Sequence, residues 1–208
     1  SNGAAIVNMK TGEVLYKNQM DYLTAEKIIK YGLEMDIMVE VFTNGRAYTL
    51  KRYMTELVEY GVNPRFTEWL KDTRETVESF SDILNNDSTI ENINLIFSDM
   101  DKRDEMRKYL LACPDVELTN SIVNNLEVGV KNCSKGATLE ILAEMLGTDM
   151  SRVMCLGDND NDCDMLKRAG ISIGMENGQD CVKHGVTYVA KNNNADGFAE
   201  AVYKFVLE

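Results

Sequence analysis

The sequence predicts an α/β protein in which an α+β module is followed by half of a doubly wound parallel sheet. From Ser134 onward, apolar strands alternate with helices and no hairpin signal separates them, which is typical of parallel βαβ units. Before Ser134, hairpin-type strands cluster with helices, and this favours an α+β module. The 208 residues are 44% hydrophobic and 27% charged, which suits one domain or two small ones with a buried core.

Two hairpins are predicted in the first fifty residues. Residues 1–21 contain two short apolar runs on either side of the turn signal at 10–13. Helical spacing follows as far as Tyr31, with Thr24 as the expected N-cap. The second hairpin covers 37–50, and its Asn44-Gly45 pair supplies the positive-φ residues of a tight turn.

The elements between the second hairpin and Ser134 mix helices and strands. Helices are predicted over 51–61, 66–84 and 102–113, and strands over 93–97, 116–118 and 126–130. Ser98-Asp99-Met100-Asp101 follows an apolar strand, and we expect Asp101 to be the N-cap of the helix after it.

The final third of the chain is predicted to alternate regularly. Helices are expected over 134–146, 162–169 and 196–207, with a short one before the last strand, and strands over 153–156, 171–174 and 186–190. Because every position of 153–156 is apolar, we expect this strand to be buried on both faces, as central parallel strands are.

Charge and cysteine content exclude several classes of protein. The chain has 22 basic and 34 acidic residues, a net charge of −12, which argues against binding nucleic acid or an anionic membrane. No apolar run is long enough to span a bilayer, and we expect no signal peptide. Five cysteines without a CxxC pair favour a reduced, cytoplasmic compartment. With one histidine and no Cys/His cluster, no structural zinc site is expected, so a metal should be hard and oxygen-bound.

A run of acidic and amide residues follows the strand at 153–156. Asp158 to Asp162 holds three carboxylates and two amides in five residues. Ligands bind beyond the carboxyl ends of parallel strands, and a divalent cation would relieve the repulsion among these acids. The alternative is an acidic turn that caps the following helix, with Asp162 or Asn161 as its N-cap.

A second feature is the predicted start of the helix at 134–146. Ser134 is a good N-cap, but Lys135 opposes the helix dipole and Gly136 is a poor helix former. A bound anion would explain both residues, whereas the alternative is an ordinary exposed lysine. A lysine and an Mg²⁺ ion facing one phosphate are the usual electrostatic arrangement for phosphoryl transfer.

The two motifs in this order resemble a known family. Ser134-Lys135-Gly136, followed by Gly157 to Asp162, is similar to motifs III and IV of haloacid dehalogenase (HAD) superfamily phosphatases, closest to the Cof-type (subfamily IIB) branch. Ile173 to Asn177 and the opening Ser1-Asn2-Gly3-Ala4 match further segments of that family. The resemblance covers 1–21 and 129–208 well, and 22–128 only by its pattern of elements.

The resemblance implies a fold and a domain division. We expect a partial Rossmann-like, HAD-type parallel-sheet core formed by 1–21 and 129–208, with its N-terminal part missing. Residues 22–128 would form an inserted α+β cap of the C2B type. An exposed sheet edge is expected where the rest of the core sheet would pair, and this edge favours aggregation or dimer pairing.

Roles are carried over residue by residue. The resemblance implies that Lys135 and Asp158 are catalytic and that Lys135 and Asn161 bind the phosphoryl group. Asp158 would bind Mg²⁺, and Asp162 would support the metal site directly, through water or through Lys135. The substrate would be a small phosphorylated metabolite such as a sugar phosphate, with no nucleic acid or membrane partner.

One departure from the family concerns activity. Its motif I, D-x-D-G-T, carries the aspartate nucleophile that forms an aspartyl-phosphate intermediate, and it is absent from these 208 residues. We therefore expect the chain by itself to be inactive, and the full-length protein to be an Mg²⁺-dependent phosphomonoesterase. The alternatives are a non-catalytic homologue that binds a phospholigand or a protein, and a phosphosugar mutase.

Overall fold

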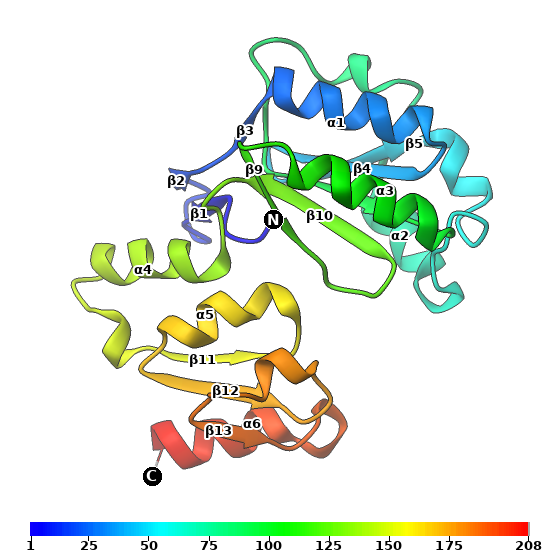
Figure 1. Ribbon diagram of the computed structural model, residues 1–208. Coiled ribbons are helices and arrows are strands. Elements are labelled where there is room, and N and C mark those ends of the chain that lie inside the picture. The colour runs from blue at the N-terminus through cyan, green and yellow to red at the C-terminus, as the bar shows by residue number, and fades with distance from the viewer. Residues whose placement is uncertain (208) are drawn as a thin grey trace. The chain divides into compact units, whose positions relative to one another are not determined.

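Two structural units make up the computed structural model, which describes residues 1–207 (Figure 1). The first unit contains residue 1 and residues 3–132, and the second contains Asn2 and the chain from Cys133 onward. The division therefore falls after Asn132 and places 3–21 in the first unit. The assignment of 1–21 and 129–132 to the same domain as the C-terminal third stays a prediction.

The first unit is built on a six-stranded mixed sheet in the order β6-β5-β4-β8-β10-β9. All neighbours in this sheet are antiparallel except the parallel pair β5 and β6. The strands are β4 (Met38–Thr43), β5 (Arg46–Leu50), β6 (Glu75–Val77), β8 (Asn92–Ile96), β9 (Val116–Thr119) and β10 (Asn125–Val130). Two small antiparallel pairs accompany it: β1 (Ala5–Val7) with β2 (Val14–Lys17), and β3 (Met20–Asp21) with β7 (Thr89–Ile90).

One face of this sheet is apolar and is covered by α1 (Tyr22–Glu34) and α3 (Met100–Leu111), as Figure 1 shows. Alternate residues along the central strands point to these helices and are fully buried: Val39, Val41, Ile93, Leu95, Leu126 and Val128. Gly32 allows α1 to approach closely, because a Cβ there would lie 3.0 Å from a methyl carbon of Val39. The core of the first unit is therefore the contact between two helices and an alternating sheet face.

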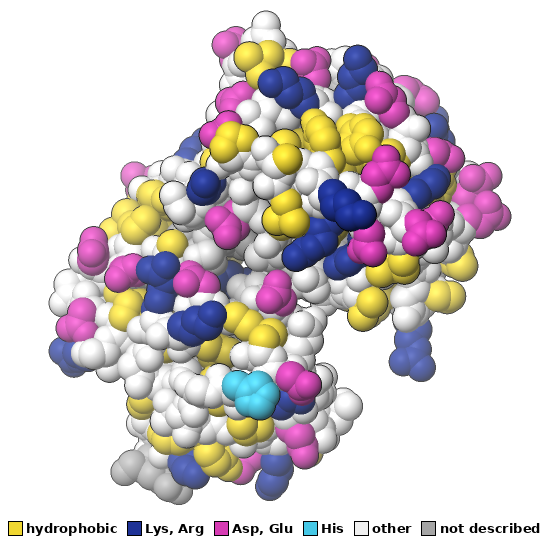
Figure 2. All heavy atoms as spheres, viewed as in Figure 1, with side chains coloured by type: hydrophobic (Ala, Val, Ile, Leu, Met, Phe, Trp, Pro, Cys, Tyr) yellow, Lys and Arg dark blue, Asp and Glu magenta, His cyan; other side chains and the backbone are white. Residues whose placement is uncertain are grey.

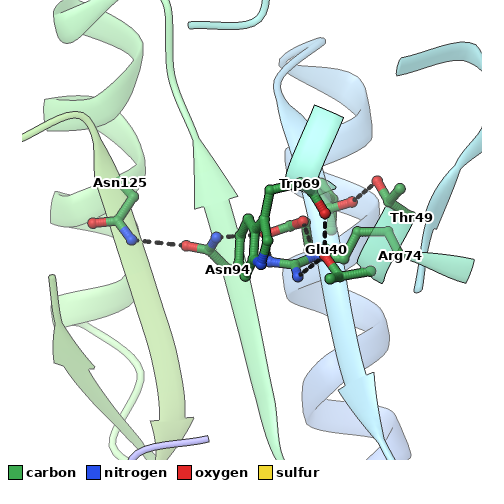
Figure 3. A network of polar contacts seen from close by, with 8 residues as sticks. Glu40, Thr49, Trp69, Arg74, Asn94 and Asn125 are labelled. Atoms are coloured by element: carbon green, nitrogen blue, oxygen red, sulfur yellow. Dashed lines mark hydrogen bonds and ion pairs between the residues drawn. The ribbon is translucent and has the colours of Figure 1, made fainter. Parts of the chain in front are cut away.

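The opposite face carries a row of polar residues across all six strands. Thr76, Thr49, Glu40, Asn94, Glu127 and Thr119 are register partners from β6 to β9. Arg74, which follows α2 (Thr67–Thr73), donates from Nε to Glu40 Oε1 at 2.6 Å, and its guanidinium lies 4.7 Å from the Trp69 ring (Figure 3). Asn94 donates to Glu40 Oε2 at 2.7 Å. The fully buried Glu40 carboxylate is thus satisfied by a cation and an amide.

The second unit contains a three-stranded parallel sheet in the order β11-β12-β13. Its elements are α4 (Lys135–Met145), β11 (Met154–Gly157), α5 (Cys163–Arg168), β12 (Ile171–Met175), β13 (Tyr188–Ala190) and α6 (Gly197–Val202). This alternation confirms the predicted parallel βαβ arrangement. Two apolar clusters form: Cys155 packs with Leu166, and Ile173 with Ala201.

Several predicted elements differ from the structure. Only 51–55 of the predicted helix 51–61 is helical, as a 3-10 turn, and the predicted helix 66–84 is replaced by α2, β6 and a 3-10 turn. The helix predicted over 196–207 is α-helical only through Val202 and continues as a π-helical turn. These segments contain few buried residues, so helical spacing alone was a weak guide.

Strand β11 is less buried than predicted. Among residues 1–207 it pairs only with β12, so it is an edge strand, as expected for an exposed sheet edge. Met154 and Leu156 are half-buried, whereas Cys155 is buried. The expectation of full burial on both faces was therefore wrong.

Helix caps were misplaced by two or three residues. Asp21, and not Thr24, caps α1, because its carboxylate accepts from the backbone N–H of Thr24 at 3.0 Å. Asp99, and not Asp101, caps α3 in the same way. Ser134 caps α4 as predicted, and its hydroxyl oxygen accepts from the backbone N–H of Ala137.

Charges of both signs are interspersed over the face shown in Figure 2. The excess of acidic residues is therefore not gathered into one acidic surface in this view. Within residues 1–207, the helices are too short or too polar for any of them to cross a lipid bilayer.

Candidate functional site

The candidate site lies in the second unit, in the loop that follows β11. Asp158 comes directly after the last residue of β11, and residues 160–162 form a 3-10 turn that leads into α5. The parallel neighbour β12 ends at the same edge, because Gly157 is the register partner of Gly174. The loop therefore occupies the carboxyl edge of a parallel sheet, the place where such sheets bind ligands.

Asp162 closes this loop on itself. One of its carboxylate oxygens, Oδ2, accepts from the backbone N–H groups of Asp158 at 2.9 Å and Asn159 at 3.1 Å. Gly157 is required for this closure, because a Cβ there would lie 2.4 Å from the Cβ of Asp162. The predicted acidic turn is thus present. The Asp162 carboxylate accepts from backbone N–H groups that precede it in the loop, and it makes no side-chain cap to α5.

Lys135 joins the same group. Its Nζ lies 2.7 Å from the second carboxylate oxygen of Asp162, Oδ1. The Asp162 side chain is 8% exposed and that of Lys135 is 35% exposed, so the pair is shielded on the carboxylate side and open on the lysine side. A cation in the first turn of α4 opposes the helix dipole, and the buried carboxylate offsets this cost.

The structural reason for a glycine at position 136 differs from the predicted one. A Cβ at this position would lie 2.5 Å from a carboxylate oxygen of Asp164 and 2.8 Å from the backbone of Met165. Gly136 therefore permits close packing of α4 on α5, and no anion is needed to explain it. Ser134 also donates to Asp164, whose pKa is lowered because hydrogen bonds from Ser134 and Arg168 outweigh the opposing effect of burial.

Asn161 points to a different partner. Its side-chain amide donates to the Oδ1 of Asn2 at 3.1 Å, and the backbone oxygen of Asn2 accepts from the thiol of Cys133. The opening segment of the sequence thus contributes one residue to the second unit. This hydrogen bond holds the Asn161 side chain toward Asn2.

Asp158 has a free carboxylate in the loop. Its side chain is half-buried and makes no hydrogen bond or ion pair to any of residues 1–207, whereas its backbone is held on both sides. The backbone oxygen accepts from Gln179 N–H at 2.9 Å, and Gln179 Nε2 donates to Asn159 Oδ1 at 3.1 Å. Asp158 is therefore fixed in position with a carboxylate still available to a ligand.

This donor set fits a hard divalent cation at Asp158. A half-buried carboxylate without a partner is a suitable oxygen ligand for Mg²⁺. The oxygens of Asp162 already accept from three donors, so an indirect role through Lys135 suits it better than direct coordination. The roles of Lys135, Asp158, Asn161 and Asp162 stay predictions, but the structure links Lys135 to Asp158 through Asp162.

The supporting residues around the loop were not predicted from the sequence. Gln179 holds the backbone of Asp158, and Gly178 lets the two segments meet, because a Cβ there would lie 2.7 Å from the Asp158 oxygen. Both residues follow the segment Ile173 to Asn177 that resembles a family motif, so proximity to that motif was the available signal. Asn2 lies in the matched opening turn, but its partnership with Asn161 depends on tertiary structure.

A hollow of about 340 Å³ in the first unit does not include these residues. It lies beside the tip of the β4–β5 hairpin and is lined by Phe42, Arg46 and Glu91 among others. Glu91 is 8% exposed and accepts from the backbone N–H of Gly45 at 2.8 Å. Because the charged groups at its wall are already paired, this hollow is not favoured as the reactive centre.

The parallel sheet, the acidic loop after β11 and the Lys135–Asp162 ion pair agree with the predicted haloacid dehalogenase-type core. A family model for haloacid dehalogenase-like hydrolases matches residues 1–202, and the chain belongs to this family. The resemblance inferred from the motifs is thus confirmed.

Individual relatives agree with this family. The chain is 39% identical over 109 residues to 5-amino-6-(5-phospho-D-ribitylamino)uracil phosphatase YcsE of Bacillus subtilis, a match that covers 52% of this chain and 44% of that protein. It therefore spans less than half the length of this relative.

Solved structures share the fold. A haloacid dehalogenase-like hydrolase from B. subtilis superposes with a TM-score of 0.85 at 23% identity, over 99% of this chain and 77% of that chain. The HAD subclass IIB sugar phosphatase BT4131 superposes with a TM-score of 0.76 at 20% identity, over 100% and 74% respectively. The predicted HAD-type α/β fold is confirmed.

Proposed function

We propose that the protein is a phosphatase that hydrolyses phosphomonoesters of small metabolites with Mg²⁺ as its cofactor. The observation that carries this proposal is the hydrogen-bonded connection from Lys135 Nζ through the Asp162 carboxylate to the backbone of Asp158. It joins the Lys135 cation to the backbone of a residue whose carboxylate has no partner among residues 1–207. Phosphoryl transfer requires a cation and a metal ligand close together.

Each residue of the loop has a distinct part in this proposal. Asp158 holds the cation, which when bound neutralises charge on the phosphoryl oxygens. Asp162 keeps Lys135 oriented and holds the backbone of Asp158 in place. The half-exposed Lys135 balances the charge of the phosphate, and Asn161 donates to a phosphoryl oxygen once it leaves Asn2.

Names of relatives support a small phosphorylated substrate. YcsE is named for a phosphoribityl compound, and BT4131 is named a sugar phosphatase. A sugar phosphate or a similar compact phosphomonoester is accordingly the substrate class proposed for the protein.

We further propose that these 208 residues release no phosphate unaided, because they contain no D-x-D-G-T segment to supply an aspartate nucleophile. In this proposal the nucleophile lies in sequence outside them, residues 22–128 act as the cap, and 1–21 with 129–208 belong to the core.

A phosphate-release screen tests the activity. The 208-residue chain and a chain that includes a D-x-D-G-T segment are compared on a panel of sugar phosphates and other phosphomonoesters, with and without Mg²⁺. The expected result is Mg²⁺-dependent release by the longer chain only. Asp158→Asn should lower kcat/KM more than the ~10–100-fold expected for the supporting change Asp162→Asn.

The matched control is Asp72→Asn, which changes an exposed aspartate in α2 of the first unit. It should leave kcat/KM unchanged. Mn²⁺ binding measured by electron paramagnetic resonance gives a readout without turnover, and Asp158→Asn should abolish it. Activity that survives Asp158→Asn at the wild-type level would show that the loop is not the reactive centre.

A further inference from the structure

Three side chains without a part in the proposed function lie together at the Asp158–Asp162 loop, and one of them belongs to it. They are Asp160, Cys163 and Cys181, and one ligand atom of each lies within 4.8 Å of the other two. Cys163 is half-buried, whereas Asp160 and Cys181 are exposed. Solvent can therefore reach the cluster through Asp160 and Cys181.

The donor atoms of this cluster select one kind of cation. Two thiols and one carboxylate are ligands for Zn²⁺, whereas Mg²⁺ and Ca²⁺ prefer oxygen alone. Two sulfurs bound tetrahedrally to one Zn²⁺ lie ~3.8 Å apart, given a Zn–S distance of ~2.3 Å. Because the ligand atoms lie within 4.8 Å of one another, a contraction of at most about 1 Å brings the two sulfurs to that separation, and water can occupy the fourth position.

The three residues are held on segments that are already joined. Asp160 and Cys163 belong to the turn that Asp162 closes and to the start of α5, and Cys181 belongs to the 3-10 turn Asp180–Val182. Gln179, two residues before Cys181, donates to Asp158 and Asn159. Because these contacts fix both segments before a cation arrives, little chain ordering opposes binding.

We propose that Asp160, Cys163 and Cys181 form a binding site for one Zn²⁺ ion, separate from the oxygen site at Asp158. The thiol protons pass to the buffer when the ion binds. This site does not depend on the proposed phosphatase activity, because none of its ligands takes part in it. No structural zinc site was expected from the sequence, because it has one histidine and no Cys/His cluster.

Metal titration of the reduced 208-residue chain tests the proposal. The chain is stripped with a chelator, kept in a phosphine reductant that does not bind metals strongly, and titrated with Zn²⁺ in excess Mg²⁺. One Zn²⁺ per chain is expected. Co²⁺ in place of Zn²⁺ should give the thiolate-to-cobalt charge-transfer absorption that only sulfur ligation produces.

Variants assign the ligands. Cys181→Ser changes an exposed side chain, so folding should be unaffected, and Zn²⁺ affinity should fall by at least ~100-fold with loss of the cobalt absorption. Cys163→Ser should do the same, and Asp160→Asn should weaken affinity by about 10-fold. Cys113→Ser is the matched control, because Cys113 lies in the first unit, and it should change neither quantity.

A second comparison separates this site from the proposed phosphatase site. Asp158→Asn should leave Zn²⁺ affinity within 2-fold of wild type while abolishing Mn²⁺ binding. The zinc proposal is wrong if Zn²⁺ affinity and cobalt absorption survive Cys181→Ser, if both are lost with Asp158→Asn, or if no Zn²⁺ binds below millimolar concentration.

Discussion

Removal of Arg74 should destabilise the first unit far more than removal of an exposed cation. The Glu40 side chain is fully buried and that of Arg74 is 10% exposed. Arg74 donates to Glu40 from Nε at 2.6 Å and from Nη2 at 3.5 Å, and Asn94 donates at 2.7 Å (Figure 3). Arg74→Ala leaves a buried carboxylate with a single amide donor.

The size of the effect follows from these contacts. Loss of one partner of a buried ion pair costs ~3–5 kcal/mol. A hydrogen bond to a charged group contributes ~1.5–3 kcal/mol, and the long Nη2 contact lies at the weak end of that range. Because Asn94 remains bonded, about 3 kcal/mol is expected for Arg74→Ala. Lys51→Ala is the matched control: Lys51 and Glu78 are 69% and 77% exposed, so the expected loss is ~0–1 kcal/mol.

Urea unfolding followed by tryptophan fluorescence measures the difference. Trp69 is the only tryptophan in the sequence and lies in the first unit, so its signal reports on that unit. Its ring lies 4.7 Å from the Arg74 guanidinium, so Arg74→Ala changes the baseline, but the transition midpoint can still be read. A loss equal to that of Lys51→Ala would refute the argument. The double variant Glu40→Leu/Arg74→Met, which removes both charges, should recover most of the lost stability.

Three further outcomes follow from local geometry. Gly157→Ala should cost ~1–3 kcal/mol in urea unfolding followed by circular dichroism, whereas Gly129→Ala, with nothing within 4 Å of its Cβ, should cost under ~0.5 kcal/mol. Asp21→Ala should cost ~1 kcal/mol at pH 7, because it removes the N-cap of α1. The hydrogen bond from the backbone N–H of Thr24 lowers the pKa of Asp21. The contribution of the Asp21 carboxylate to the free energy of unfolding is therefore complete above about pH 4 and is lost as the pH falls through the folded-state pKa. The same stability difference between wild type and Asp21→Ala at pH 3 as at pH 7 would contradict this. Iodoacetamide should modify exposed Cys181 before Cys163, as peptide mass spectrometry can follow. Burial and the neighbouring thiol raise the pKa of Cys163 to about 12, which leaves little reactive thiolate; equal rates of modification would contradict this order.

Local signals in the sequence were sufficient for most elements. Asn44 and Gly45 both have positive φ and connect β4 to β5, as the tight-turn pattern predicts. Parallel pairing in the second unit followed from alternating apolar runs and helices. The segment 51–84 was misassigned, because its polar composition satisfies helical spacing without burying a continuous apolar face.

The sequence predicted which residues belong to the candidate site, but not which hydrogen bonds they make. Lys135 and the aspartates were found because a cation and an acidic cluster are each unusual in their local setting. Which oxygen of Asp162 receives Lys135, and which receives the backbone of Asp158, depends on the approach of α4 to the loop. Gly136 was given a ligand-binding reason because its packing partner, Asp164, lies 28 positions later in the sequence (164 − 136 = 28).

The order of residues along the chain determined the family, the parallel half-sheet and the chemical types in the acidic loop, because short-range patterns encode local conformation and motif spacing. Tertiary structure alone decided which groups meet. It paired buried Glu40 with Arg74, joined Lys135 to Asp162 and brought Cys163 and Cys181 together. These contacts join residues distant in sequence, and their energies depend on burial, which no local pattern records.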